Sequence, residues 1–182
     1  HTVNISGKIK VVIEQGDDYQ VELRGEETNR EKVTMAEADG RLTVNAGSET
    51  SGSPVRLYLT VPELKTITTD ATDDVQIKGF NGPLQVNAKG GGYEVKIYGD
   101  ASNLYLTQEG ENKIDVIGNF DLLEATLQAG ARLEAEKPGV REAIITASIN
   151  SRVELMVREK LTQRKDDSSR IRVKGNPQVL EQ

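Results

Sequence analysis

The sequence predicts an all-β fold, a right-handed parallel β-helix (solenoid) with about six coils of roughly 20 residues, preceded by an N-terminal β-strand region. Apolar and polar residues alternate along most of the chain, which is typical of β-strands. An apolar signature also returns at a nearly constant interval after residue 62. Aromatic residues make up only 4% of the 182 residues, with no Trp. A narrow interior can be filled by aliphatic side chains alone, whereas a rounder core usually relies on large rings.

The repeat is a run of the form apolar, any residue, apolar, any residue, Gly. Complete copies lie at 75–79, 95–99, 114–118 and 171–175, and weaker copies without the Gly lie at 133–135 and 153–155. The first positions of successive copies are 18 to 20 residues apart. Such a fixed period indicates stacked structural repeats. We expect the copies to stack in register at about 4.8 Å, with a corner of the chain at each Gly.

A second strand-like element precedes the signature at the same interval. It is clearest at 84–86, 104–106 and 125–127, and less regular at 64–67 and 145–147. Each repeat is therefore expected to hold two short strands separated by small or polar residues. One coil buries only a few aliphatic side chains, so it is stable only within a stack. Parallel crossovers are right-handed in nearly all known cases, which predicts the sense of winding.

Residues 1–62 alternate in the same way but lie outside the repeat, and the charged stretch 26–32 predicts one short helical turn. We expect residues 1–62 to form an N-terminal β-strand region or cap and residues 63–182 to form the solenoid, the two being one continuous structural unit. An antiparallel sandwich with regular turns is the alternative fold. The nearly constant step between the copies favours the solenoid.

Charge and composition limit the partners and the compartment. The formal net charge of −6 disfavours nucleic acid and anionic lipid, because a negative surface repels phosphates. There is no Cys, which excludes disulfides and thiol catalysis. No apolar run approaches the roughly 18 residues of a transmembrane segment. The chain opens without Met or an export signal, so we expect the mature form of an extracytoplasmic protein, in the cell envelope, surface-exposed or periplasmic.

Several segments, in their order along the chain, are similar to those of a known family. They lie at 11–16, 19–23, 39–44 and 55–64, and they are followed by the repeats and by an ending at 173–177. The most specific are Val61-Pro62-Glu63-Leu64 and Val173-Lys174-Gly175-Asn176-Pro177. Over nearly its whole length the chain thus resembles the bacterial putative auto-transporter adhesin family with the head GIN domain. The resemblance implies an exported protein with a right-handed β-helical part, and it brings no catalytic residues.

The residues themselves give catalysis little support. His1 is the only histidine, which argues against a Ser-His-Asp triad or a His-based metal site, and we expect no cofactor and no metal. The run Gly90–Gly92 lacks the Lys-Ser/Thr and the helix of a phosphate loop, so we expect a solenoid corner. Paired carboxylates of a polysaccharide-active enzyme, or a weak Ca²⁺ site, stay open as alternatives to solvated turn acids. The candidate acids are Asp70, Asp73, Asp74, Asp166 and Asp167, with Asp73 expected near Glu94 or Glu111.

Tyr93, Tyr98 and Tyr105 are the candidate binding residues. If the leucines on either side of Tyr105 point inward, Tyr105 points outward, and a neighbouring Tyr98 would complete an exposed aromatic patch. Such a patch suits contact with a glycan or a protein. Isolated surface tyrosines are the alternative.

Three functions are compatible with the sequence. The repeats, the lack of catalytic groups and the resemblance favour a non-catalytic extracytoplasmic binding module, an adhesin or cell-envelope scaffold that recognises glycan or surface protein. A polysaccharide-active β-helix enzyme would instead show turnover that is lost in Asp73→Asn. A purely structural element would form homo-oligomers through its edges, which light scattering would detect.

Val95→Asp should unfold the protein, because Val95 is expected to face the interior of a middle coil and an unpaired buried charge is severely destabilising. Lys96→Asp should be nearly neutral, because the next side chain is expected to face solvent. Urea unfolding compares the two variants. Equal losses of stability would contradict the assignment of inward and outward positions.

Overall fold

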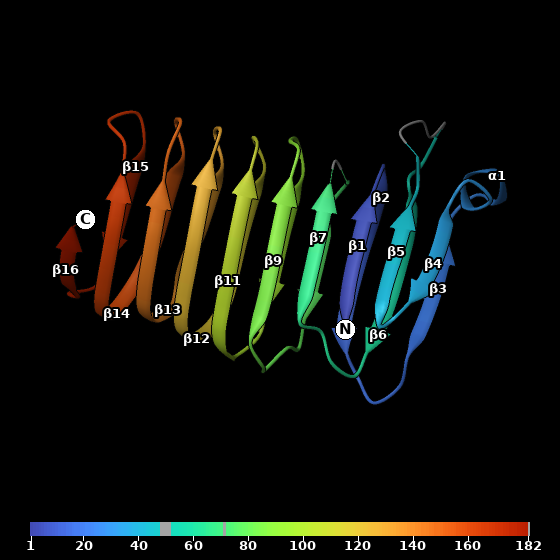
Figure 1. Ribbon diagram of the computed structural model, residues 1–182, viewed down its shortest axis with the longest axis horizontal. Helices are drawn as coiled ribbons and strands as arrows, with labels where there is room; N and C mark the ends of the chain where they lie inside the picture. The colour runs from blue at the N-terminus through green and yellow to red at the C-terminus, as the bar shows by residue number, and fades with distance from the viewer. Residues whose placement is uncertain (48–51, 71, 182) are drawn as a thin grey trace.

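The chain forms a right-handed parallel β-solenoid in a computed structural model that describes residues 1–47, 52–70 and 72–181 (Figure 1). Strand makes up 67% and helix 2%, with about six turns of solenoid, so the predicted fold class is confirmed. In the N-terminal part the elements are β1 (Thr2–Ser6), β2 (Ile9–Gln15), β3 (Gln20–Arg24), α1 (Glu27–Arg30), β4 (Thr34–Ala38), β5 (Arg41–Asn45) and β6 (Val55–Val61).

Among its described residues, the repeating part contains ten strands, three of which are long enough to turn a corner of the solenoid. They are β7 (Thr66–Asp70), β8 (Val75–Lys78), β9 (Leu84–Lys89), β10 (Glu94–Tyr98), β11 (Ala101–Glu109), β12 (Lys113–Gln128), β13 (Arg132–Ala147), β14 (Arg152–Lys165), β15 (Arg170–Lys174) and β16 (Gln178–Glu181). Residues 113–117 of β12 pair with β10, whereas residues 120–128 pair with β11. Each long strand therefore contributes to both sides of the coil.

The signature copies stack as predicted, and we call this side of the coil the signature ladder. Val95 stands beside Val75 on one neighbouring strand and beside Ile114 on the other. The same register continues through Leu133 and Val153 to the last copy. The first five of these side chains are at most 1% exposed, so the aliphatic positions face the interior. Lys96 faces outward and pairs with Glu94.

The opposite side, the second ladder, is also confirmed, with one correction of register. Leu104 stands beside Leu84 and Leu123, whereas Ala125 stands beside Leu106. The segment 125–127 was predicted to align with 104–106, and it is displaced by two residues. A shift of two keeps every side chain on the same face of a strand, so alternation alone cannot detect it.

The N-terminal strands belong to the same sheet as the repeats. β1 pairs in parallel with both β5 and β7, and β2 pairs in parallel with both β6 and β8. The first coil of the sequence thus lies between the coil β5–β6 and the coil β7–β8. β3 and β4 pair antiparallel with β6 and β5, and they cover that end of the stack (Figure 1). The domain division at residue 62 stays a prediction.

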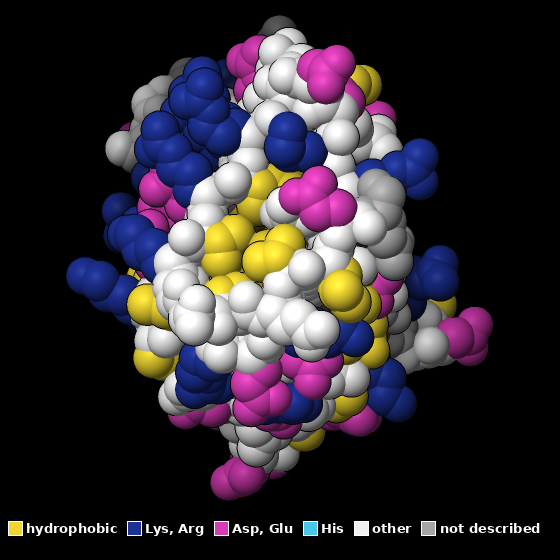
Figure 2. Space-filling view, turned by 90° about the vertical axis from the view of Figure 1, so that its left-hand side faces the viewer, with side chains coloured by type: hydrophobic (Ala, Val, Ile, Leu, Met, Phe, Trp, Pro, Cys, Tyr) yellow, Lys and Arg dark blue, Asp and Glu magenta, His cyan; other side chains and the backbone are white. Residues whose placement is uncertain are grey.

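The two ends of the solenoid differ. At the far end, β15 and β16 pair only with β14 among the described strands. Figure 2 looks at this end and shows hydrophobic side chains at its centre. Val179 and Leu180 of β16 are among the exposed large hydrophobic residues, at 47% and 40%.

In the part of the chain that the structure describes, no helix has the length and apolar character needed to cross a bilayer.

Of the glycines that close the complete signature copies, Gly99, Gly118 and Gly175 sit where coils approach each other, whereas at Gly79 no heavy atom lies closer than 3.9 Å to an added Cβ. Gly118 has a φ of 146°, and a Cβ added there would overlap the backbone carbonyl of Gly99 on the neighbouring coil. Gly79 and Gly175 also have positive φ. The corner therefore excludes a side chain for two reasons, backbone conformation and space.

Gly118→Ala should lower the free energy of unfolding by roughly 1–3 kcal/mol from the backbone conformation alone, with a further loss from the overlap. Gly82→Ala is the matched control, because no heavy atom lies within 4 Å of its added Cβ and its φ is not positive. This control should change stability by at most about 1 kcal/mol, with either sign. Urea unfolding measures both, and equal effects would contradict the close approach of the coils.

Candidate binding surfaces

Tyr93 lies inside the solenoid. Its side chain is 5% exposed, and its hydroxyl donates to the Lys89 carbonyl oxygen at 2.7 Å and lies 3.0 Å from the Thr69 hydroxyl. Burial raises the pKa of the phenol. Tyr93 lies one residue before β10 and two residues before the inward Val95, so the alternation of the sequence already indicated an inward side chain. The ring fills the core beneath a turn and offers little surface to a ligand.

Tyr98 and Tyr105 lie on different sides of the coil. Tyr98 belongs to the signature ladder, between Lys78 and Ile117, whereas Tyr105 belongs to the second ladder, between Gln85 and Glu124. Tyr105 points outward with 36% exposure, as its alternation with buried leucines predicted. The strand pairing thus separates the two rings, which were expected to form one patch.

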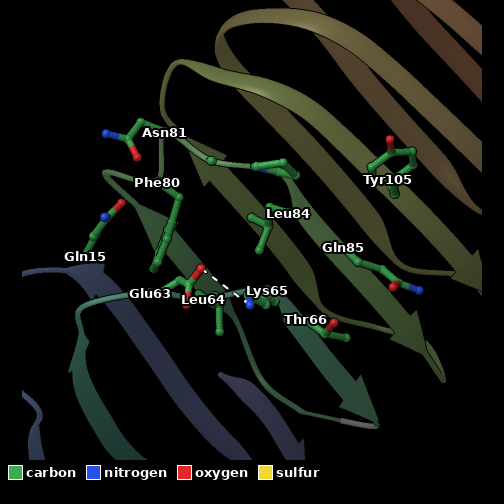
Figure 3. Close-up of a pocket in the computed structure, with 12 residues that line it drawn as sticks. Gln15, Glu63, Leu64, Lys65, Thr66, Phe80, Asn81, Leu84, Gln85 and Tyr105 are labelled. Carbon is green, nitrogen blue, oxygen red and sulfur yellow. Dashed lines mark ion pairs between the residues drawn. The ribbon is translucent and has the colours of Figure 1, made fainter.

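Tyr105 instead borders a cavity of about 530 Å³ at a corner of the solenoid (Figure 3). The cavity lies between the connection that leads into β7 and the connection that leads into β9. Phe80, Pro83 and Tyr105 give it apolar surfaces. Its volume falls within the range of about 300–1,000 Å³ that is usual for small-ligand pockets. We call it the Tyr105 cavity.

The polar lining of the Tyr105 cavity combines carboxamides with one ion pair. Gln15, Asn81 and Gln85 each bring a donor and an acceptor. Glu63 and Lys65 face each other across 3.7 Å (Figure 3), and both side chains are more than 60% exposed. A ligand with several hydroxyl groups, each of which can donate and accept a hydrogen bond, would match this lining. None of these five residues was a candidate binding residue from the sequence. Glu63, Lys65 and Asn81 lie in connections without periodic signal. Gln15 and Gln85 are exposed polar residues of β2 and β9, which alternation alone does not distinguish from other outward positions.

Two of the candidate turn carboxylates, Asp74 and Asp166, are engaged in contacts within the protein. Asp74 pairs with Lys10 at 3.3 Å. Asp166 accepts a hydrogen bond from the Ile149 backbone N–H at 2.7 Å and one from the Ser168 hydroxyl at 2.9 Å. The bond from the Ile149 backbone, followed by hydrogen bonds from Ser169 and Ser168, lowers the pKa of Asp166 to about 2. Asp166 therefore stays ionised at neutral pH and cannot donate a proton as a general acid.

A second cavity, of about 540 Å³, lies beside the turns of the signature ladder. Asp74, rather than Asp73, lines it together with Glu94 and Glu111. The hydrogen bond from Lys96 lowers the pKa of Glu94, so this carboxylate is held ionised. Basic residues of later coils line the other part of the cavity. Among the residues described, no group of three or more His, Cys, Asp or Glu is placed to hold a metal ion.

Beside this cavity, Lys113 joins carboxylates of three coils. Its ammonium lies 2.9 Å from Asp115, 3.0 Å from Glu134 and 3.7 Å from Glu94. Burial alone would lower the pKa of Lys113, but hydrogen bonds and charges from Asp115 and Glu134 outweigh it, and the pKa is raised. Burial raises the pKa of Asp115, and the nearby Glu94 carboxyl adds to that rise. The cluster is a partly exposed ion-pair network.

Comparisons with known proteins agree with this architecture. The family model described as "Putative auto-transporter adhesin, head GIN domain" matches residues 1–177. A putative lipid binding protein from Parabacteroides distasonis is 17% identical, with a TM-score of 0.67 over 99% of this chain and 87% of that one. A putative adhesin from Bacteroides fragilis is 16% identical, with a TM-score of 0.62 over 99% and 91%. At such identities the likeness concerns the fold alone. No curated protein matches the chain.

Asp166→Asn should destabilise the protein at neutral pH, because the amide loses the charge that accepts the Ile149 N–H. The pKa of Asp166 falls from 3.8 to about 2 on folding, so its contribution is present above about pH 4 and is lost as the pH falls towards 2. Urea unfolding at several pH values measures the difference between wild type and variant. A difference that does not shrink between pH 5 and pH 2 would refute the assignment.

Proposed function

Because the chain belongs to the putative auto-transporter adhesin family with the head GIN domain, we propose that it is a non-catalytic binding module of the cell envelope that recognises glycans through the Tyr105 cavity. The family suggests an envelope or cell-surface location and a surface partner. The finer points, an extracytoplasmic site of action and a glycan as the ligand, are part of the proposal.

The observation that carries the proposal is an outward tyrosine ring and three carboxamides that line the same open corner. A sugar presents apolar C–H faces and a rim of hydroxyl groups. Tyr105 and Pro83 offer apolar surfaces for such a face, and Gln15, Asn81 and Gln85 offer hydrogen bonds for the rim. A pocket with aromatic surface and a few convergent polar groups is the usual form of a small-ligand site.

The state of the carboxylates supports binding rather than hydrolysis. A glycosidase requires one carboxyl group that holds a proton near neutral pH beside one that does not. In the turns, Asp74 is paired with Lys10 and Asp166 is held ionised by backbone and hydroxyl hydrogen bonds. Burial and the nearby Glu94 carboxyl raise the pKa of Asp115, but this carboxylate is engaged in an ion pair with Lys113 at 2.9 Å.

A lipid ligand is the other possibility raised by the comparisons, through the description of one similar structure. An acyl chain needs an enclosed apolar space. Between the two ladders of this protein the interior is occupied by packed aliphatic side chains such as Ile97, Leu104 and Leu133, each at most 2% exposed. The Tyr105 cavity is open and partly polar. Both features favour a glycan.

Tyr105→Ala should weaken binding to a glycan by about tenfold, as expected when an aromatic contact residue is truncated. Tyr98→Ala is the matched control and should bind normally, because Tyr98 lies on the signature ladder and does not line the cavity. A glycan array supplies the ligand, and titration of a neutral oligosaccharide from it gives the affinities.

Binding of wild type to extracellular-matrix proteins, measured in parallel, tests a protein partner. If wild type binds neither a glycan on the array nor a matrix protein, the proposed function is overturned. Equal loss of affinity in the two tyrosine variants would show that the Tyr105 cavity is not the site.

A further inference from the structure

An outward row on the signature ladder changes from acidic to basic along the solenoid. It is formed by the residue that precedes each signature copy, and the parallel register places these residues side by side on consecutive strands. From β10 to β15 the row reads Glu94, Lys113, Arg132, Arg152 and Arg170. We call the last three the arginine ladder. All three side chains are exposed.

The neighbouring charges are paired, whereas the arginine ladder is not. Glu94 pairs with Lys96 at 2.9 Å, Glu134 pairs with Lys113 at 3.0 Å, and Glu154 pairs with Arg172 at 3.2 Å. Within the described residues, the guanidinium groups of the arginine ladder make no ion pair and no hydrogen bond, since every such contact involves other side chains. These three acids are therefore already paired with other cations, and the three arginines have no paired acid.

Such a row is unfavourable for the fold itself. Consecutive strands are about 4.8 Å apart, and like charges directly opposite each other on neighbouring strands are destabilising. Figure 2 shows Lys and Arg side chains gathered on one side of the end where β15 lies. Anions supplied from outside at the same spacing would relieve the repulsion.

The arginine ladder also borders a groove. The cavity of about 540 Å³ beside the turns is lined by Arg132 and Arg152, together with Gly130 and Asn150 from the same two coils. Its lining residues come from successive coils, beginning with Asp74 before β8, so the groove follows the solenoid axis. Its C-terminal part is basic on one side and uncharged on the other.

We propose that the arginine ladder and this groove bind a linear acidic polysaccharide, a polymer with one carboxylate on each sugar, lying along the solenoid axis. Guanidinium groups bind carboxylates through two parallel hydrogen bonds, so successive arginines suit a polymer with regularly repeated acids. A nucleic acid is less suited, because Tyr93, the aromatic residue in the lining of the groove, is only 5% exposed and offers little surface on which bases could stack. The inference does not rest on the Tyr105 cavity, which lies at a different corner.

The test uses polygalacturonate as the probe, with fully methyl-esterified polygalacturonate as its neutral counterpart. Arg132→Gln/Arg152→Gln/Arg170→Gln should weaken binding to polygalacturonate at least tenfold and should leave the melting temperature unchanged or slightly raised. Arg30→Gln/Arg41→Gln/Arg158→Gln is the matched control, since it removes the same charge from exposed arginines elsewhere. It should bind within about twofold of wild type, which corresponds to less than about 0.5 kcal/mol.

Three results would overturn the proposal. The first is that wild type does not bind polygalacturonate, and the second is that the two triple variants lose the same affinity for it. The third is that a single-stranded oligothymidylate binds as tightly as polygalacturonate and that its binding depends on the arginine ladder in the same way. Tyr105→Ala should bind polygalacturonate with the affinity of wild type. The triple variant of the arginine ladder should retain the wild-type affinity for any neutral glycan. The failure of one site is therefore distinguishable from the failure of the other.

Discussion

A coil of this protein has only a few aliphatic side chains, and it can bury them only against the coils on either side. In-register contact between like positions on parallel strands is therefore the interaction on which everything else depends. Val95, between Val75 and Ile114, shows the pattern, with all three side chains fully buried. The period of the sequence follows from this contact, because a coil of different length would move its apolar residues out of line with its neighbours.

Close stacking also determines what the corners and turns can contain. At Gly118 the next coil leaves no room for a Cβ. Beneath the turns the interior becomes polar, and buried side chains satisfy the backbone there. Gln108 donates to the Asn112 carbonyl oxygen at 2.6 Å, and Asn112 donates to the Gly90 carbonyl oxygen at 3.1 Å. Small and polar residues between the strands are thus part of the core, because buried backbone groups need hydrogen-bond partners.

The same register organises the surface. A residue type that recurs at one position of the repeat becomes a continuous row along the solenoid axis. Where opposite charges meet on neighbouring strands, as around Lys113, they form an ion-pair network. Where one sign recurs without a partner, as from Arg132 to Arg170, the row presents a regular positive surface. A solenoid is therefore suited to recognise extended, periodic ligands, whereas single pockets such as the Tyr105 cavity form at irregular corners.

By itself the sequence determined the strand period, the inward and outward positions and the corner glycines, because alternation and spacing are local properties of the chain. The sequence also places a basic residue directly before each of three signature copies, which are the residues of the arginine ladder. The even spacing between Tyr93 and the inward Val95 likewise indicated that Tyr93 points inward. Only the tertiary structure decided that β1 and β2 lie between later strands, that Tyr98 and Tyr105 face different sides, and that Tyr105 borders a cavity. These features depend on which distant segments pair, and pairing between parallel strands leaves no periodic mark in the connections that bring them together.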